Sequence, residues 1–541
     1  MPNINILSRR AFFDRSFKVG LGAALATLVD IPWVMKRALA EGNIGRPGPD
    51  GKIKKMLFIF LRGANDALNS VIPVGDPAYN ATNRPTIMIP KDPGTDYTAG
   101  SSCDFPQSVL ATDPTFGYGY ALRLGNGFAA LHPSLKFLAP VYNAGDLALV
   151  HRVAYPKQSR SHFDSQNYWE TGAPNNNLVK EGIFYRAMVE SGLANSAPLT
   201  GVSVASSLPL SLRGSAAAMT NLTDPTRYNL LGIPNNTAGN AKADNFINTA
   251  NADPFPDKKN RELLNLQYQN MANTLRIFAG INFAEAGNTF VDDVNTDNDA
   301  PYHLFPTSNA TNGGYALHAS DPQKYVVDTG AYGFFTNLKA AALVLNKTDA
   351  IVAGVEIDGF DTHNNQVGAK PVIGQHANLL GRIGWAMYAL RKYFTLYSDQ
   401  AKWENLAVVT LSEFGRTTIQ NTSMGTDHAE AGVMFVAGGA VKGYGKGNPT
   451  GVFGCSPSDA VPWAPGAATG TTGSMFGVSG RYLKRAYDYR SVLGKLIRDH
   501  LGATQNQLNR VIPGYLVGGE HLLGGGTSMD GTPIMGEPNI V

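Results

Sequence analysis

Short runs of apolar residues recur along the chain, and within them apolar and polar positions do not alternate. Each run ends in a turn rich in glycine or polar side chains. Apolar runs of about four to eight residues between turns are typical of strands buried on both faces, as in parallel sheets. We therefore predict five buried parallel strands, at residues 55–61, 147–150, 350–357, 406–411 and 433–437.

Longer segments between these runs place apolar residues at helical spacing. The clearest covers residues 375–397, and further candidates cover residues 131–144 and 260–278. The alternation of strands and helices predicts an α/β fold with a mostly parallel central sheet flanked by helices. In the clearest helix the apolar side comprises Leu379, Leu380, Ile383, Met387 and Leu390.

One long stretch departs from this alternation. From residue 175 to residue 345 the strand signal fades, and segments rich in Asn, Pro and Gly take over. The whole chain has 59 Gly and 32 Pro but only 16% charged residues, which suggests long ordered loops on a rigid scaffold. We interpret residues 41–541 as one α/β domain in which residues 175–345 form a large loop-rich insertion or cap.

The first part of the chain has the three parts of a signal peptide. Arg9 and Arg10 stand before an aromatic pair, an apolar run covers residues 19–29, and residues 38–40 offer a small-x-small cleavage site. The paired arginines mark the twin-arginine type. We expect the twin-arginine export machinery to carry the folded chain across the inner membrane, with cleavage after residue 40. The mature protein is then periplasmic or extracellular.

An uncleaved membrane anchor or an amphipathic helix is the alternative for this segment. Its apolar run is short and is followed by Asp30 and Pro32, which disfavours a membrane span. No later segment has the unbroken apolar length of a membrane helix. We therefore expect no stable membrane span after cleavage.

Charge and cysteine content narrow the classes of function. The formal net charge of +3 is small and is not clustered after the signal, so the sequence indicates no nucleic-acid partner. The two cysteines, Cys103 and Cys455, are too few to form a metal cluster alone. In an oxidising compartment they can pair, but the sequence does not show whether their Cα atoms approach closely enough.

Side chains able to bind a metal gather where the predicted strands end. In an open parallel sheet ligands bind at the carboxyl ends of the strands. Carboxylates and imidazoles suit zinc, manganese and similar divalent ions. For each residue alone a solvated loop or a helix cap is a sufficient explanation, but together they indicate a shared site. Asp66, Asp361, His363 and Glu413 follow strands, and Asp427 and His428 precede the fifth strand in a loop that can return to the same edge.

A second group of residues suits attack on an anionic ester. Ser161 offers a hydroxyl, flanked by the guanidinium of Arg160 and the imidazole of His162. Arg160 can neutralise the anion, and a metal can lower the pKa of the hydroxyl. The alternative is a helix N-terminus in which the serine caps a first turn with Asp164 and Gln166. Both interpretations can hold, and because adjacent side chains generally point apart, Ser161 and His162 need not form a pair.

A set of motifs lies at residues 60–69, 131–133, 159–163, 169–172, 359–363, 412–417, 425–428 and 488–493. Together these motifs resemble one large bacterial family, catalogued as domain of unknown function 1501. The resemblance covers nearly the whole mature chain, and members of the family often carry twin-arginine signals. The family is similar to the alkaline phosphatase and sulfatase superfamily, which implies an alkaline-phosphatase-like α/β fold with metals at the strand ends.

The superfamily resemblance implies roles for particular residues. Asp66 resembles the metal-binding aspartate after the first strand. Asp361 and His363 resemble the pair that holds one metal, and His428 resembles the later histidine of that same site. Ser161, with Ser159 as the alternative, stands near the position of the superfamily's Ser or Thr nucleophile. The resemblance therefore implies that the aspartate and the two histidines converge on one point.

The resemblance breaks at Glu413 and Phe414. The superfamily usually has an Asp-His pair there, which holds a second metal, and a phenylalanine cannot ligate. The second site is therefore either lost or rebuilt with Glu413, so that one divalent metal, zinc or manganese, is favoured over two. The spacing between Asp361 and His363 is also shorter than is usual in the superfamily.

Two functions from different classes follow. The first is an exported hydrolase acting on a phosphate or sulfate ester of a small molecule or of the envelope, in which a metal activates Ser161 and Arg160 or Arg416 counters negative charge. The second is a non-catalytic cell-envelope binding protein on a degenerate hydrolase fold. The loss of a ligand at Phe414 favours the binding protein, whereas the retained acids and histidines favour the enzyme.

The signal assignment predicts the effect of a conservative double substitution. Replacing Arg9 and Arg10 by Lys should leave the precursor in the cytoplasm, because the export machinery reads the guanidinium pair. Cell fractionation with detection of the precursor and mature forms checks this. A double variant that still reaches the periplasm in a strain lacking the twin-arginine machinery would contradict the assignment.

Overall fold

A computed structural model of the chain describes residues 43–48, 50–97, 119–193, 199–215, 217, 219–224, 238, 241, 242, 245, 274–283, 290–297, 300–307, 329–461 and 481–541. The predicted signal peptide therefore lies outside the described residues, as does most of the predicted helix at residues 260–278. Only the end of that segment, from residue 274, is described, and it is helical.

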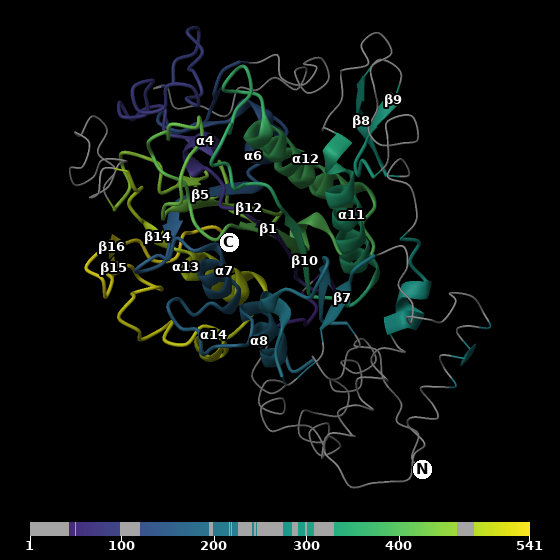
Figure 1. Ribbon diagram of the computed structural model, residues 1–541. Helices are drawn as coiled ribbons and strands as arrows, with labels where there is room; N and C mark the ends of the chain where they lie inside the picture. The colour runs from purple at the N-terminus through teal and green to yellow at the C-terminus, as the bar shows by residue number, and fades with distance from the viewer. Residues whose placement is uncertain are drawn as a thin grey trace.

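One sheet of nine strands, as far as the described residues show, forms the centre of the molecule (Figure 1). Its strands are β1 (Lys55–Leu61), β5 (Leu147–Ala154), β6 (Gly201–Val204), β7 (Thr220–Leu222), β10 (Val352–Ile357), β11 (Leu406–Leu411), β12 (Gly432–Ala437), β13 (Val452–Phe453) and β14 (Tyr487–Asp488). The order is β13-β5-β12-β11-β1-β10-β6-β7, and β14 also pairs with β5. The five predicted strands are all present.

The sheet is mostly parallel, and one strand reverses its direction. β1 lies between β10 and β11 and is parallel to both, so these three predicted strands are neighbours. β12 is antiparallel to β11 and to β5, so the prediction of a parallel fifth strand is wrong. The apolar run showed that both faces are buried but carried no information on direction. The residues between β11 and β12 contain no helix to make a parallel crossover, and the chain returns antiparallel.

Helices cover both faces of the sheet, because successive side chains of a strand point to opposite sides. In β1, the side chains of Leu57, Ile59 and Leu61 join one hydrophobic core, and those of Met56 and Phe58 join the other. The first core includes α6 (Leu138–Asn143), α11 (Tyr332–Lys347) and α12 (Gln375–Leu396). The second includes α7 (His162–Thr171), α8 (Ile183–Glu190), α13 (Tyr489–Lys495) and α14 (Gln505–Val511). Figure 1 shows the two groups on opposite sides of the sheet.

The remaining elements are short. α4 (Ala67–Ser70) follows β1, and the 3-10 helices are η1 (Pro133–Leu135), η2 (Leu210–Leu212), η5 (Thr329–Ala331) and η6 (Trp403–Asn405), with a π-helical segment η7 (Leu496–His500). Three small sheets contain β2 (Val71–Ile72), β3 (Leu122–Arg123) and β4 (Ala130–Leu131), then β8 (Val291–Asp297) and β9 (Ala300–His303), then β15 (Gly526–Thr527) and β16 (Pro533–Ile534).

Part of the stretch interpreted as an insertion or cap belongs to the central sheet. β6 pairs with β10 and β7 extends the sheet further, while α11 packs in the core beside them. The predicted helix at residues 375–397 is α12, whereas the one at 131–144 is divided between the end of β4, η1 and α6.

Among the described residues no helix is long and apolar enough to cross a membrane. Cys455 is a buried free thiol, and Cys103 lies outside the described residues.

Candidate metal centre

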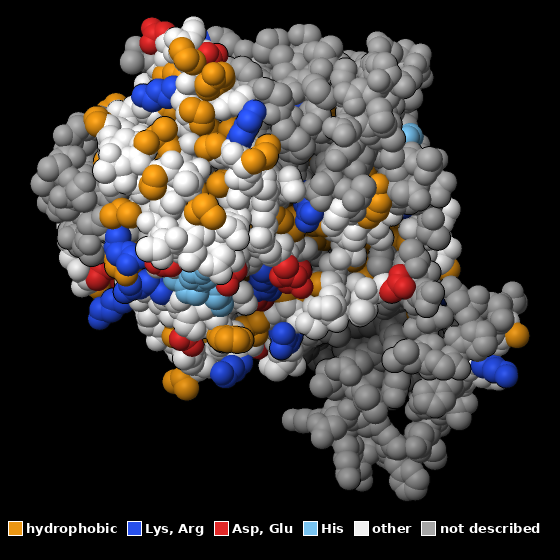
Figure 2. Space-filling view, turned by 45° about the horizontal axis from the view of Figure 1, so that its top comes forward, with side chains coloured by type: hydrophobic (Ala, Val, Ile, Leu, Met, Phe, Trp, Pro, Cys, Tyr) orange, Lys and Arg blue, Asp and Glu red, His pale blue; other side chains and the backbone are white. Residues whose placement is uncertain are grey.

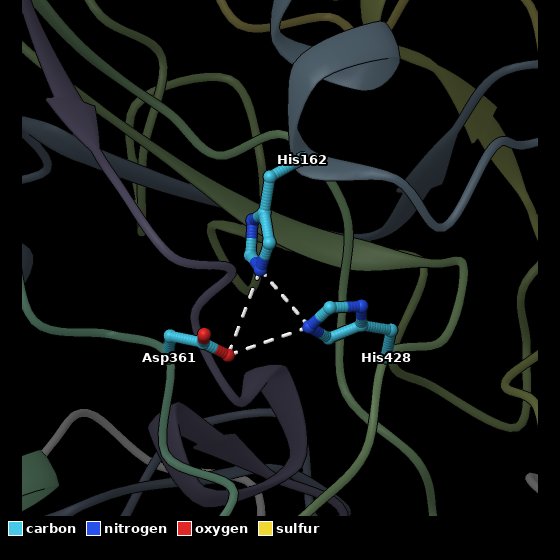
Figure 3. Close-up of side chains that lie close together, drawn as sticks. All are labelled: His162, Asp361 and His428. Atoms are coloured by element: carbon cyan, nitrogen blue, oxygen red, sulfur yellow. Dashed lines mark hydrogen bonds and ion pairs between the residues drawn. The ribbon is translucent and has the colours of Figure 1, made fainter.

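Four side chains able to bind a metal meet at the carboxyl edge of the central sheet. Asp361 and His363 share the loop between β10 and α12. His162 begins α7, and His428 lies in the loop that leads into β12. Because β12 is antiparallel, it begins at the edge where β1, β10 and β11 end, and this brings His428 to the site. Figure 3 shows His162, Asp361 and His428 pointing toward one another from separate segments.

The donor atoms of these four side chains are close together. Nε2 of His428 is 2.9 Å from Nε2 of His162 and 2.8 Å from Nε2 of His363. Oδ1 of Asp361 is 3.6 Å, 3.2 Å and 3.4 Å from Nε2 of His162, His363 and His428, respectively. The structure thus brings together the aspartate and two histidines that the sequence analysis grouped, and it adds His162 as a third imidazole.

The other ring nitrogen of each histidine faces a hydrogen-bond acceptor. Nδ1 of His162 is 2.8 Å from Oε1 of Glu413, and Nδ1 of His428 is 2.8 Å from a backbone carbonyl oxygen. Nδ1 of His363 is 3.4 Å from Oδ1 of Asp427. Carboxylates and carbonyls only accept hydrogen bonds, so each Nδ1 is the donor to its acceptor, and Nε2 of each ring is the nitrogen that faces the converging atoms.

The donor atoms of His162, Asp361 and His428 all lie within 4.8 Å of one another. Nε2 of His363 adjoins this group through His428 and Asp361, at 2.8 Å and 3.2 Å. Imidazole with carboxylate is a ligand set that zinc takes. Ligating histidines commonly donate their other N–H to a carboxylate or a carbonyl. The donor atoms and their partners therefore fit a divalent metal.

Glu413 supports His162 from the interior. Its side chain is fully buried, and Oε1 accepts hydrogen bonds from Nδ1 of His162, from N of Gly63 at 2.8 Å and from Nε2 of Gln166 at 3.0 Å. Burial alone raises the pKa of Glu413, but these hydrogen bonds outweigh it and hold the pKa below its usual value. The sequence predicts Glu413 as a metal ligand. Its carboxylate instead contacts Nδ1 of His162, the ring nitrogen that faces away from the converging donor atoms. There it orients His162 and raises the pKa of that imidazole.

Phe414 packs against two of the imidazoles. Its ring is 4.8 Å from the ring of His162 and 4.9 Å from that of His428, measured between centroids, and the side chain is buried. The residue that interrupts the superfamily motif thus forms an apolar wall beneath the two histidines. Burial and the nearby charge of Arg416 lower the pKa of His428, which keeps this ring neutral and able to bind a metal at neutral pH.

Arg416 is an internal group. Its side chain is fully buried, and its guanidinium donates to the carbonyl oxygens of Ala64, Gly63 and Thr426 and to Oδ1 of Asp361. Burial raises the pKa of Asp361, but the guanidinium outweighs that effect and lowers it. Protein groups thus occupy the guanidinium, and a role of Arg416 in countering the charge of a substrate stays a prediction.

Asp427 is placed beside His363 rather than among the converging atoms. Its Oδ1 accepts a hydrogen bond from Nδ2 of Asn421 at 2.9 Å, and its Oδ2 pairs with Arg481 at 2.6 Å. Burial raises the pKa of Asp427, but these two partners and His363 outweigh it and lower the pKa. The loop that carries Asp427 packs closely against the loop that carries His363, because a Cβ atom added at Gly425 would lie only 2.2 Å from the backbone oxygen of His363. Asp427 therefore orients a ligand, as Glu413 does.

Asp66 does not join the four converging side chains. It is fully buried at the N-terminus of α4, where Oδ1 accepts from N of Leu68 at 3.2 Å. Arg84, also fully buried, donates to both carboxylate oxygens, at 2.9 Å and 3.1 Å, and Gln366 donates to Oδ2 at 2.7 Å. Both oxygens of Asp66 are thus occupied by protein donors, so the role of metal ligand that the resemblance implied is not supported here.

Ser161 is the N-cap of α7. Its hydroxyl accepts a hydrogen bond from N of Asp164 at 3.4 Å, while His162 turns away toward Glu413. The helix-cap interpretation therefore holds, and the serine and the histidine do not act as a pair. Arg160 is exposed, its backbone oxygen receives the hydrogen bond from His428, and its guanidinium lies 4.4 Å from the ring centre of Tyr482.

The centre is open to solvent. Side-chain exposure is 24% for His162, 27% for His428, 37% for His363 and 48% for Asp361. Figure 2 shows a patch of histidine at the surface with basic and acidic side chains beside it. The strand predicted at residues 147–150 extends to Ala154, so His162, like Asp361 and His363, lies in a segment beyond a strand end at this edge.

The fold and the site together define an α/β protein with a candidate metal centre at the carboxyl edge of a mostly parallel sheet. The chain belongs to the family described as protein of unknown function (DUF1501), whose model matches residues 53–452 of the 541. This match includes all four converging side chains. Comparisons with curated proteins and with solved structures found no match.

The buried ion pair between Asp66 and Arg84 predicts that two substitutions differ strongly in their effect on the free energy of unfolding. Asp66→Asn should lower the free energy of unfolding by about 3–5 kcal/mol, because it leaves the charge of Arg84 buried without a partner. Asp427→Asn should cost at most about 1 kcal/mol, because its pair with Arg481 is about half exposed. Denaturant unfolding of both variants without added metal checks this. Equal losses in the two variants would contradict it.

Proposed function

We propose that His162, His363, His428 and Asp361 bind one divalent metal ion, zinc or manganese, and that the protein is an exported hydrolase acting on an anionic ester. One observation carries the proposed centre, namely that Nε2 of three imidazoles, each held through Nδ1 by a hydrogen-bond acceptor, converges near one carboxylate oxygen. When bound, such an ion polarises an ester oxygen and lowers the pKa of the attacking hydroxyl or water.

The surroundings support an anionic substrate. The guanidinium of Arg160 is exposed and rests against Tyr482, which leaves its N–H groups free to meet a phosphate or sulfate oxygen. Ser161 follows directly and is partly exposed, so its hydroxyl can face the same substrate. Arg160 thus holds the anion, and either Ser161 or a water molecule attacks it.

A non-catalytic metal-binding protein of the cell envelope is the second candidate, and the number of donor atoms favours it. Four protein ligands fill a tetrahedral zinc site, as in structural sites, whereas catalytic zinc keeps one position for water or substrate. Oδ1 of Asp361 is shared with Arg416, so the coordination is closed only if this oxygen also binds the ion. With three histidines alone, one position stays open for chemistry.

The metal content of the purified mature protein tests the centre. Wild-type protein should carry about one zinc or manganese ion per chain, and His363→Ala or His428→Ala should lose most of it, because one of few strong ligands disappears. Asp358→Ala is the matched control, since this exposed carboxylate also follows β10. Elemental analysis after dialysis measures the content. A wild-type protein that holds no stoichiometric ion, even after incubation with zinc or manganese, would overturn the proposed centre.

A screen of phosphate and sulfate esters separates the two candidates. The hydrolase should turn over at least one ester class, and His428→Ala should lower kcat/KM about 100-fold or more through loss of the ion. Arg160→Ala should mainly raise KM if Arg160 binds the anion, whereas Ser161→Ala should abolish turnover only if the serine is the nucleophile. Bound metal without turnover of any ester would instead support the binding protein.

A further inference from the structure

A single buried amide joins the two loops that carry three of the four proposed ligands. Oε1 of Gln366 accepts hydrogen bonds from Oγ1 of Thr362 at 3.1 Å and from Oγ1 of Thr426 at 2.8 Å. Thr362 lies between the two ligands of one loop, and Thr426 lies two residues before the ligand of the other. All three polar side chains are buried. The amide therefore links backbone segments that are distant in sequence at the point where each presents its ligands.

The carboxylate of Asp66 fixes the orientation of this amide. Nε2 of Gln366 donates to Oδ2 of Asp66 at 2.7 Å, and an ionised carboxylate can only accept. Burial raises the pKa of Asp66, but Arg84 outweighs it and lowers the pKa, so the carboxylate stays charged. Because the nitrogen must face Asp66, the oxygen must face the two hydroxyls. Arg84 anchors the group through further hydrogen bonds to the backbone oxygens of Thr417 and Thr418, both at 2.9 Å.

The two loops are also in direct contact. N of Thr426 donates to the backbone oxygen of Thr362 at 3.1 Å, and Nδ2 of Asn421 donates to the backbone oxygen of His363 at 2.9 Å. Thr362 points into the protein, while the side chains of its two neighbours are 48% and 37% exposed. This is the alternation expected of an extended segment. Fixing the inward threonine thus fixes the outward directions of Asp361 and His363.

We propose that Gln366 is a positioning residue, which holds the loops of residues 361–363 and 426–428 together so that their three ligands are pre-arranged for the metal. The proposal rests on the proposed metal centre. Metal sites require donor atoms within about 0.2 Å of their ideal distances, and loops without such links open easily. Loss of a partner behind the ligands typically lowers metal affinity by about 10–100-fold. Asp66 and Arg84 thereby support the centre without touching the ion.

Isosteric substitutions of the two threonines test this role. Thr362→Val and Thr426→Val remove the hydroxyl and keep the shape, whereas Thr362→Ser and Thr426→Ser keep the hydroxyl. Thr410→Val is the matched control, because its buried hydroxyl accepts a hydrogen bond from N of Phe435 at 2.9 Å within the sheet. Metal-free protein is titrated with zinc against a competing chelator. Each valine variant should bind zinc about 10–100-fold more weakly, and the serine variants and the control should stay within about threefold of wild type.

Amide hydrogen exchange of the metal-free proteins separates this proposal from the proposed function. The amides of residues 361–363 and 426–428 should exchange at least about 10-fold faster in Thr426→Val than in Thr426→Ser, with the central strands unchanged. Unchanged exchange, or zinc affinity of the valine variants equal to that of wild type, would overturn the positioning role. If wild-type protein binds neither zinc nor manganese, the metal centre fails, and the exchange measurement still decides whether the amide holds the loops.

Discussion

Three imidazole rings whose Nε2 atoms converge near one carboxylate oxygen are the arrangement on which the rest of the site depends. Each ring is held through its other nitrogen, since Nδ1 faces Glu413, Asp427 or the backbone oxygen of Arg160. These contacts keep the three Nε2 atoms turned toward one another, which is the arrangement that the proposed metal centre needs.

One antiparallel strand, β12, makes this convergence possible. β1, β10 and β11 are parallel and end at one edge, so their following loops meet there. β12 is antiparallel and starts at that edge, so the loop before it adds His428. His162 arrives from the segment after β5, which antiparallel pairing with β12 also directs to this edge. Every ligand is thus on a loop or at a helix start, while the strands beneath supply rigidity.

The buried charges behind the site act as supports. Arg84 neutralises Asp66, and Arg416 donates to four backbone oxygens and to the carboxylate of Asp361. Neither guanidinium is available to a ligand, because each is fully buried with its partners. Phe414 adds an apolar wall beside two of the imidazoles. These buried side chains support the candidate centre from the interior.

The sequence by itself determined the strands and the class of fold, because a run such as residues 406–411 is apolar on both faces and is followed by polar turn residues. The strand ends also grouped the acids and histidines of this edge, since they are the usual place of sites in parallel sheets, and the family resemblance implied that Asp361, His363 and His428 converge. Tertiary structure alone decided that Asp66 pairs with Arg84 and that His162 joins the imidazoles. Both outcomes depend on contacts between distant segments, which local pattern does not encode. A carboxylate looks the same in sequence whether a guanidinium or a metal will neutralise it, and only the packed fold shows which cation is near.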